Sequence, residues 1–223
     1  MRYRIERIGV EDWQRLRKVR LAQLLDFPMA FGETHETALA LGEADWRART
    51  SRANEPGRVG LVAVDADGEW VGTMLSFPDE EQAATVVLVG VWVAGEHRGR
   101  ERGVTDALLD AAVDWARTEG GAQRMLLGVH EENARAAAFY LRRGFAYTGG
   151  ETPYRLDPQA RILEMALPLD RPQPDRPQPD RPQPSLVPTP STSALGGSPV
   201  SSPSGDCPRL INSRSYQGTV RPR

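Results

Sequence analysis

The sequence predicts an α/β or α+β domain built around a mixed β-sheet, and three patterns support that fold class. One strand, two helices and three strands come first, and strands then alternate with helices. Residues 84–93 form a long β-branched run that is apolar on both faces, as in a central strand. Residues 104–115 carry apolar side chains at helical spacing, which is typical of a helix that packs on a sheet.

Capping and turn signals define the elements of the N-terminal half. Asp12 places negative charge where the first helix begins, and Pro28 ends that helix. The segment 31–36 is polar and is expected to be irregular. Asp67 and Gly68 form a tight turn between two strands, which are therefore expected to be antiparallel.

Glycines divide the C-terminal half into its elements. Gly120 and Gly121 end the helix that starts near Gly103, and Gly144 ends a second, alanine-rich helix. A short strand separates these two helices, and two late strands follow them. The predicted strands are residues 3–8, 61–64, 70–77, 84–93, 125–129, 145–148 and 162–167, and the predicted helices are residues 11–27, 43–52, 103–119 and 133–143.

Proline content divides the chain at residue 170. Twelve of the 18 prolines lie in the last 54 residues, where seven arginines and four aspartates give a charge of +3. The first 169 residues carry 21 basic and 26 acidic side chains, which give a charge of −5. We therefore expect one acidic domain at residues 1–169, long enough to bury a hydrophobic core.

The segment 170–223 has the composition of a disordered tail. It opens with three repeats of Asp-Arg-Pro-Gln-Pro and continues with serine, threonine, glycine and proline. Because it has few large apolar residues, burial cannot offset the entropy cost of folding it. Its prolines favour an extended spacer, and a proline-rich ligand for a partner protein is the alternative. The sole cysteine, Cys207, lies here and is expected to be a free thiol.

Composition excludes several classes of protein. A net charge of −2 for 223 residues argues against a nucleic-acid partner. The chain has no apolar run of about 18 residues and no apolar signal-peptide core at its N-terminus, so we expect a cytoplasmic protein without a membrane partner. A single cysteine excludes a disulfide framework, and no histidine pair or acidic cluster has the spacing of metal ligands.

A loop rich in glycine and arginine follows the predicted central strand. It leads from Val93 to a helix that begins near Gly103, and helix N-termini bind phosphate through free N–H groups and a positive dipole end. Gly99 would let the backbone approach a pyrophosphate. Alone, the same loop also fits a solvated turn into a helix. Fixed positive charge comes from three arginines, Arg98, Arg100 and Arg102.

A second motif lies about 30 residues downstream and consists of Asn133, Ala136, the pair Phe139-Tyr140 and the pair Gly144-Phe145. Together the two motifs resemble the GNAT superfamily of acetyl-CoA-dependent N-acetyltransferases. Members of that family have a strand, a pyrophosphate loop with a Q/R-x-x-G-x-G/A signature and a helix. A later helix in these proteins carries an asparagine, an aromatic-tyrosine pair and a Gly-Phe pair. The resemblance covers most of residues 3–167 and implies a GNAT-like mixed, mostly antiparallel central sheet flanked by helices.

The resemblance also implies a site for acetyl-CoA where the family's strands splay, here between residues 84–93 and 125–129. Asn133 would hydrogen-bond the pantetheine arm, and an amine would attack the thioester directly while backbone N–H groups stabilise the oxyanion. Tyr140 would act as the catalytic general acid and protonate the departing thiolate. The remaining cofactor-binding residues implied are Val91, Trp92 and Val93 for the pantetheine amides, and Arg98, Gly99, Arg100, Arg102, Gly103, Val104 and Thr105 for the pyrophosphate.

The loop departs from the family pattern. Its two halves fit only if the loop holds two extra residues, Glu101 and Arg102, and Thr105 replaces the usual glycine or alanine. A carboxylate at Glu101 would repel a pyrophosphate unless it turns outward.

The sequence does not identify the general base that would take the proton from the acceptor amine. The predicted central strand carries no carboxylate. His130 is expected to be a surface histidine, with a proton relay as the alternative. The candidates for the general base are Glu80, Glu81, Glu33, Glu36 and a water chain.

The acceptor is expected to be an amine, on a small molecule or at a protein N-terminus. Residues 27–46 should select it, and Glu33 and Glu36 in that stretch favour a cationic amine. The sequence leaves open whether the chain forms a homodimer. The rival interpretation is a catalytically silent GNAT-like module that binds a partner through the proline-rich tail. A Rossmann-type nucleotide-binding domain is disfavoured, because no G-x-G-x-x-G follows the first strand.

Overall fold

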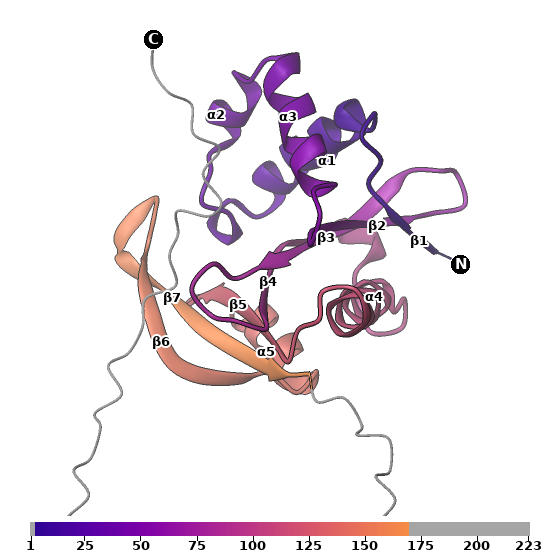
Figure 1. Cartoon of the computed structure of the whole chain (residues 1–223). Helices are drawn as coiled ribbons and strands as arrows, with labels where there is room; N and C mark the ends of the chain where they lie inside the picture. The colour runs from indigo at the N-terminus through magenta and orange to yellow at the C-terminus, as the bar shows by residue number, and fades with distance from the viewer. Residues whose placement is uncertain (1–2, 170–223) are drawn as a thin grey trace, which may run out of the picture.

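A seven-stranded sheet forms the centre of the computed structural model, which describes residues 3–169 (Figure 1). The predicted tail at residues 170–223, including Cys207, lies outside the described residues. The strands are β1 (Arg4–Arg7), β2 (Val59–Val64), β3 (Trp70–Pro78), β4 (Thr85–Val93), β5 (Arg124–His130), β6 (Ala146–Tyr154) and β7 (Asp157–Pro168). Their order is β1-β2-β3-β4-β5-β7-β6. Among these strands only β4 and β5 pair in parallel, which confirms the predicted mixed, mostly antiparallel sheet with residues 84–93 at its centre.

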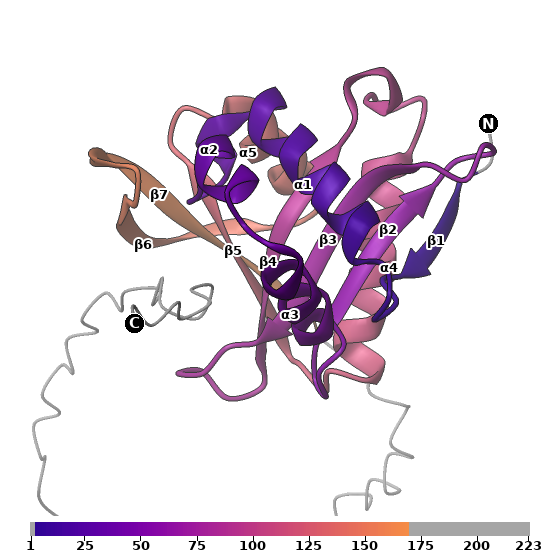
Figure 2. The same ribbon diagram turned by 90° about the horizontal axis from the view of Figure 1, so that it is seen from above.

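Helices cover both faces of the sheet (Figures 1 and 2). The helices are α1 (Trp13–Asp26), α2 (His35–Leu39), α3 (Glu43–Ala53), α4 (Val104–Thr118) and α5 (Ala134–Arg142), with 3-10 turns at Pro28–Ala30 and Gly95–His97. The first three helices lie over one face, and α4 and α5 lie over the other. No helix between residues 3 and 169 is both long enough and apolar enough to cross a membrane.

The helix α2 corrects one prediction from the sequence. The segment 31–36 is not irregular throughout, because α2 begins at His35. Thr34 caps this helix, and its Oγ1 accepts a hydrogen bond from the backbone N–H of Thr37 at 3.1 Å. A threonine at an N-cap is a recognised start signal, but the polar composition around it obscured that signal.

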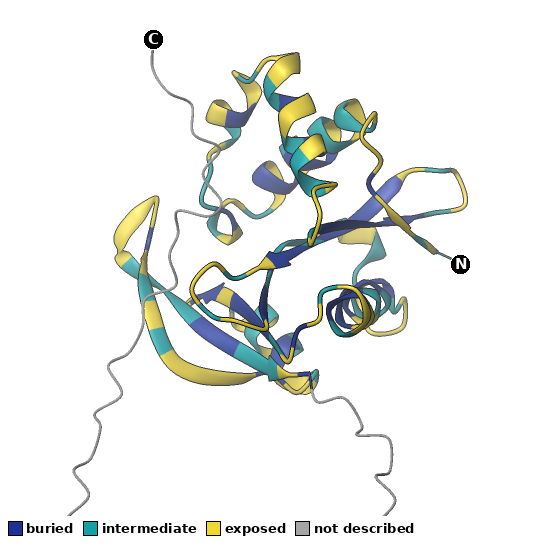
Figure 3. Cartoon of the chain, in the orientation of Figure 1, coloured by how far each residue is buried: buried dark blue, intermediate teal, exposed yellow. Residues whose placement is uncertain are grey.

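Two hydrophobic clusters fix helices to the sheet, and Figure 3 shows buried residues on both kinds of element. Leu108, Leu109 and Ala112 of α4 are buried against β2 and β3, which confirms the predicted apolar stripe of this helix. On the other face, Val19 of α1 is buried together with Val62 of β2. The strands at the centre of the sheet are therefore held rigidly from both sides.

The sheet opens at its centre, because β4 and β5 diverge after a short parallel stretch. Their pairing ends at Val87 and Leu126, and β4 continues to Val93 beside β3 alone. The register between β3 and β4 shifts between Thr73 and Leu75, where β4 carries a bulge of one extra residue. Gly90 in this bulge has a φ of +61°, a conformation that glycine adopts without steric cost.

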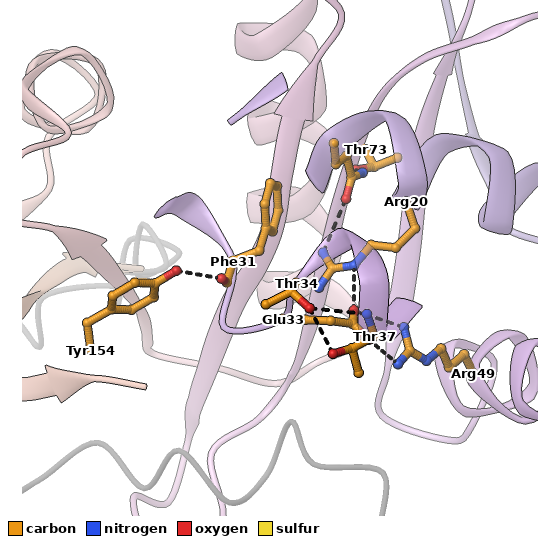
Figure 4. Close-up of polar contacts among 9 residues, drawn as sticks. Arg20, Phe31, Glu33, Thr34, Thr37, Arg49, Thr73 and Tyr154 are labelled. Atoms are coloured by element: carbon orange, nitrogen blue, oxygen red, sulfur yellow. Dashed lines mark hydrogen bonds and ion pairs between the residues drawn. The ribbon is translucent and has the colours of Figure 1, made fainter. Parts of the chain in front are cut away.

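Buried ion pairs and a tyrosine fix the segment between α1 and α2. Glu33 accepts a hydrogen bond from Arg20 Nε at 3.1 Å and two from the terminal nitrogens of Arg49, at 3.1 and 2.6 Å (Figure 4). The Tyr154 hydroxyl at the end of β6 donates to the carbonyl oxygen of Phe31 at 2.8 Å. Burial by itself raises the pKa of the Glu33 carboxyl, but Arg49 and Arg20 outweigh this effect and lower the pKa below the ordinary value of 4.5.

We expect Glu33→Gln to destabilise the protein at neutral pH and to lose this penalty in acid. A carboxyl whose pKa is lowered on folding adds stability that is complete above its unfolded-state pKa and is lost as the pH falls through its folded-state pKa. Urea unfolding should therefore show a difference between wild type and variant that shrinks as the pH falls below 4.5. Glu36→Gln, at an exposed position of α2, is the matched control. A penalty that does not depend on pH would contradict the expectation.

Candidate functional site

The gap between β4 and β5 opens into a cavity of about 620 Å³. One part of its wall comes from the two diverging strands, the loop after β4, the start of α4 and the helix α5. The other part comes from the segment between α1 and α2 and from the turn between β6 and β7. Ligand pockets typically combine several converging elements with a few polar groups, so this cavity is the candidate site.

The structure brings most of the predicted site residues together at this cavity. Those that line it are Val91, Trp92, Val93, Arg98, Gly99, Arg100, Thr105, Asn133 and Tyr140. The predicted residues Arg102, Gly103 and Val104 do not line it. Val104 is buried in the core, and Gly103 caps α4 with a φ of +66°. The conformation of Gly103, which is costly for other residues, shapes the loop that surrounds the cavity.

The loop after β4 presents positive charge to the cavity. Because Gly103 has no side chain to cap α4, the first N–H groups of this helix are left for a ligand or solvent. Arg98 Nε donates to the Val93 carbonyl oxygen at 2.7 Å, and the Arg98 guanidinium pairs with Asp26. Burial lowers the pKa of Arg98, and the nearby Arg135 guanidinium lowers it further. Two arginines that repel each other beside a helix N-terminus suit an anionic ligand.

Tyr140 lies deep in the cavity wall. It is 6 % exposed, and its ring makes edge-on contacts with Phe139 and Phe145 at centroid distances of 5.4 Å each. Its hydroxyl has no hydrogen-bond partner among residues 3–169. Burial raises the pKa of Tyr140 well above the usual value for tyrosine. The hydroxyl is therefore protonated at neutral pH and can donate a hydrogen bond to a ligand in the cavity.

Asn133 has the N-cap role that the sequence suggested, and it also lines the cavity. It is the N-cap of α5, and its Oδ1 accepts a hydrogen bond from the backbone N–H of Ala136 at 3.1 Å. The side-chain amide also lines the cavity, and its N–H groups donate to none of the described residues. Because capping of the helix uses only Oδ1, the side-chain amide N–H groups of Asn133 remain as donors for a ligand.

His130 was expected at the surface, and this prediction is wrong. The residue is 6 % exposed and lines the cavity at the end of β5. Its ring packs edge-on against Tyr154 at a centroid distance of 4.9 Å. Its Nδ1 accepts a hydrogen bond from the backbone N–H of Glu132 at 3.2 Å, so the neutral ring carries its proton on Nε2. The ring is buried because the β6–β7 turn folds over the strand end, a contact that no local pattern reveals.

The structure separates the four carboxylates that were candidates for the general base. Glu80 and Glu81 line the cavity, from the loop between β3 and β4. Glu33 and Glu36 do not line it, and Glu33 is held by two arginines. His130 is a further titratable group at the cavity.

Some residues that line the cavity or hold its wall in place come from distant parts of the chain and carry no local signal. Asp26 ends α1, pairs with Arg98 and accepts a hydrogen bond from the Trp92 indole nitrogen at 2.7 Å. These partners lie 66 and 72 residues away in the sequence, so only the fold brings them together. Arg135 and Tyr154 reach the cavity in the same way, from α5 and β6.

Solved structures share this fold. A Salmonella typhimurium protein solved with its cofactor acetyl-CoA has a TM-score of 0.62, 21 % identity, and coverage of 77 % of this chain and 96 % of that one. A ribosomal-protein-alanine N-acetyltransferase from Brucella melitensis has a TM-score of 0.62 and 20 % identity, with coverage of 74 % and 99 %. A GNAT superfamily phosphinothricin acetyltransferase from Sinorhizobium meliloti, solved with acetyl-CoA, has a TM-score of 0.61 and 19 % identity, with coverage of 75 % and 89 %.

Sequence comparison identifies the family. A search of curated proteins found no match. Residues 17–145, more than half of the 223, match the acetyltransferase (GNAT) family. This span contains both motifs quoted above and both strands that border the cavity. The chain therefore belongs to the acetyltransferase (GNAT) family.

Proposed function

We propose that this chain is an N-acetyltransferase that moves an acetyl group from acetyl-CoA to a primary amine by direct attack. The observation that carries the proposal is the cavity in the β4–β5 gap, which has Tyr140 in its wall and a positively charged loop at one end. Membership of the family supports acetyl transfer. The Salmonella and Sinorhizobium structures contain acetyl-CoA, which supports the same co-substrate here.

Acetyl-CoA would lie along the free side of β4. β5 no longer pairs with residues 91–93, so the backbone groups there that bond neither β3 nor Arg98 are available to the pantetheine amides. The Asn133 amide adds a donor from α5. The pyrophosphate would lie against Gly99, Arg98 and Arg100 and against the main-chain N–H groups at the start of α4.

The reaction forms a C–N bond and breaks a C–S bond. The acceptor nitrogen attacks the thioester carbonyl carbon, and a backbone N–H of β4 stabilises the charge that develops on the carbonyl oxygen. The C–S bond then breaks, and Tyr140 gives its proton to the departing thiolate. Burial raises the pKa of Tyr140, so its hydroxyl holds a proton in the resting site. A base removes the proton from the acceptor nitrogen.

The lining of the cavity also contains candidates for the base and a wall for the acceptor. Glu80, Glu81 and His130 line the cavity and are the candidates for the base, directly or through water. Phe31 and Tyr154 form the wall by which an acceptor would approach. The Brucella enzyme is named for ribosomal-protein alanine and the Sinorhizobium enzyme for phosphinothricin, so we retain both a protein N-terminus and a small molecule as acceptor classes.

Thiol release from acetyl-CoA in the presence of a panel of amines tests this function. Wild type should turn over at least one amine, and Tyr140→Phe should lower kcat by about 100-fold or more, because a general acid contributes roughly that much. Tyr147→Phe, at an exposed tyrosine of β6, is the control and should match wild type. Equal kcat for wild type and Tyr140→Phe would contradict the role of Tyr140. Acetyl-CoA binding without turnover of any amine would favour the catalytically silent module instead.

Deletion of Glu101 and Arg102 tests the pyrophosphate loop. Neither residue lines the cavity, and the deletion restores the loop length that is usual in the family while it removes a carboxylate. Calorimetric titration should therefore show acetyl-CoA affinity that is preserved or tighter. A folded deletion variant that no longer binds acetyl-CoA would show that the two residues contribute to the site.

A further inference from the structure

A chain of buried polar side chains runs from α1 to Thr73 of β3 (Figure 4) and continues to the bulge in β4. Arg20 and Gln23 of α1 are 6 % and 3 % exposed, and Thr73 of β3 is fully buried. Buried polar groups are costly unless each finds a partner, so their arrangement is constrained.

The hydrogen bonds in this chain all run in one direction. Arg20 donates to the Gln23 side-chain oxygen at 3.2 Å, and the Gln23 amide nitrogen donates to Thr73 Oγ1 at 2.8 Å. The Thr73 hydroxyl then donates to the carbonyl oxygen of Gly90 at 2.7 Å. Because the Gln23 amide uses its only acceptor on Arg20 and a donor on Thr73, the Thr73 proton is directed to Gly90.

The last bond fixes the peptide unit between Gly90 and Val91. This peptide is trans, as are all peptide bonds in the described chain, so its N–H points opposite to its C=O. Since the Gly90 C=O points to the Thr73 hydroxyl, the Val91 N–H points away from Thr73, in a part of β4 that no longer pairs with β5. Val91 lines the cavity there.

We propose that Gln23 and Thr73 are positioning residues that aim the Val91 N–H at the acetyl carbonyl oxygen. This inference rests on the proposed acetyl transfer and identifies the side chains that orient the N–H group that stabilises the oxyanion. The hydrogen bonds of Gln23 and Thr73 are needed because residue 90 is a glycine. A bulge at such a flexible residue needs a contact from outside to hold its peptide plane.

The same chain reaches the wall where the acceptor would approach. Arg20 also donates to Glu33, and its guanidinium lies 4.6 Å from the centroid of the Phe31 ring. Phe31 lines the cavity. The acceptor wall and the β4 bulge are therefore held by one set of buried contacts.

Gln23→Glu tests the inference without a change in side-chain size. The new carboxylate still accepts from Arg20, but it has no N–H for Thr73 and would draw the Thr73 proton to itself, away from Gly90. Thr73→Val removes the hydroxyl altogether, and Thr73→Ser restores it. Ser76→Ala is the matched control, because Ser76 is a buried β3 residue that donates to the Val87 carbonyl oxygen at 3.0 Å, in the part of β4 still paired with β5.

The measurements are kcat and KM for acetyl-CoA, the calorimetric Kd for CoA, and Tm. Gln23→Glu and Thr73→Val should lower kcat by about 10-fold or more, since small misplacements of reacting groups have effects of this size. The Kd for CoA, which has no acetyl group, should stay within about 2-fold of wild type, and Thr73→Ser should recover most of kcat. Ser76→Ala should lower Tm at most and leave kcat near wild type.

Three results would overturn the inference. The first is wild-type kcat in both Gln23→Glu and Thr73→Val. The second is an equal fall in kcat for Ser76→Ala. The third is a loss of CoA binding that accounts for the whole fall in activity. Absence of turnover in wild type with every amine would overturn the proposed function instead, so the two failures are distinguishable.

Discussion

The end of hydrogen bonding between β4 and β5 at Val87 and Leu126 is the constraint on which the rest of the structure depends. Backbone N–H and C=O groups inside a sheet need partners, and β4 beyond Val87 has lost one neighbour. The helix α4 packs on one face of the sheet and α1 packs on the other. The gap opens into the cavity, and under the proposed function the edge of β4 pairs with the amides of acetyl-CoA.

The parts around this gap divide the proposed chemistry between them. The loop after β4 and the start of α4 supply positive charge and free N–H groups, and α5 supplies Asn133 and Tyr140. The wall opposite depends on Glu33 and its two arginines and on the contact between Tyr154 and Phe31. Arg20 belongs both to that wall and to the chain that holds the bulge at Gly90.

Local signals in the sequence predict most of the fold and one side of the site. The apolar run that became β4, the stripe of α4 and the glycines that end helices each act over a few residues, so they can be interpreted alone. The burial of His130 and the role of Asp26 depend on contacts between distant elements, with Tyr154 and Arg98. The hydrogen-bonded chain from Arg20 to Gly90 joins three elements. The sequence does not predict it either, because no spacing within one element marks it.

Amide NMR of the full chain labelled with ¹⁵N-valine tests most directly whether the β4–β5 gap holds acetyl-CoA. If it does, titration with acetyl-CoA will shift the Val91 and Val93 resonances in β4 and the Val129 resonance in β5, and these shifts will saturate together. Val62, buried in β2 away from the cavity, will move little. Unchanged Val91 and Val129 resonances at saturating acetyl-CoA would contradict the claim that this gap is the site.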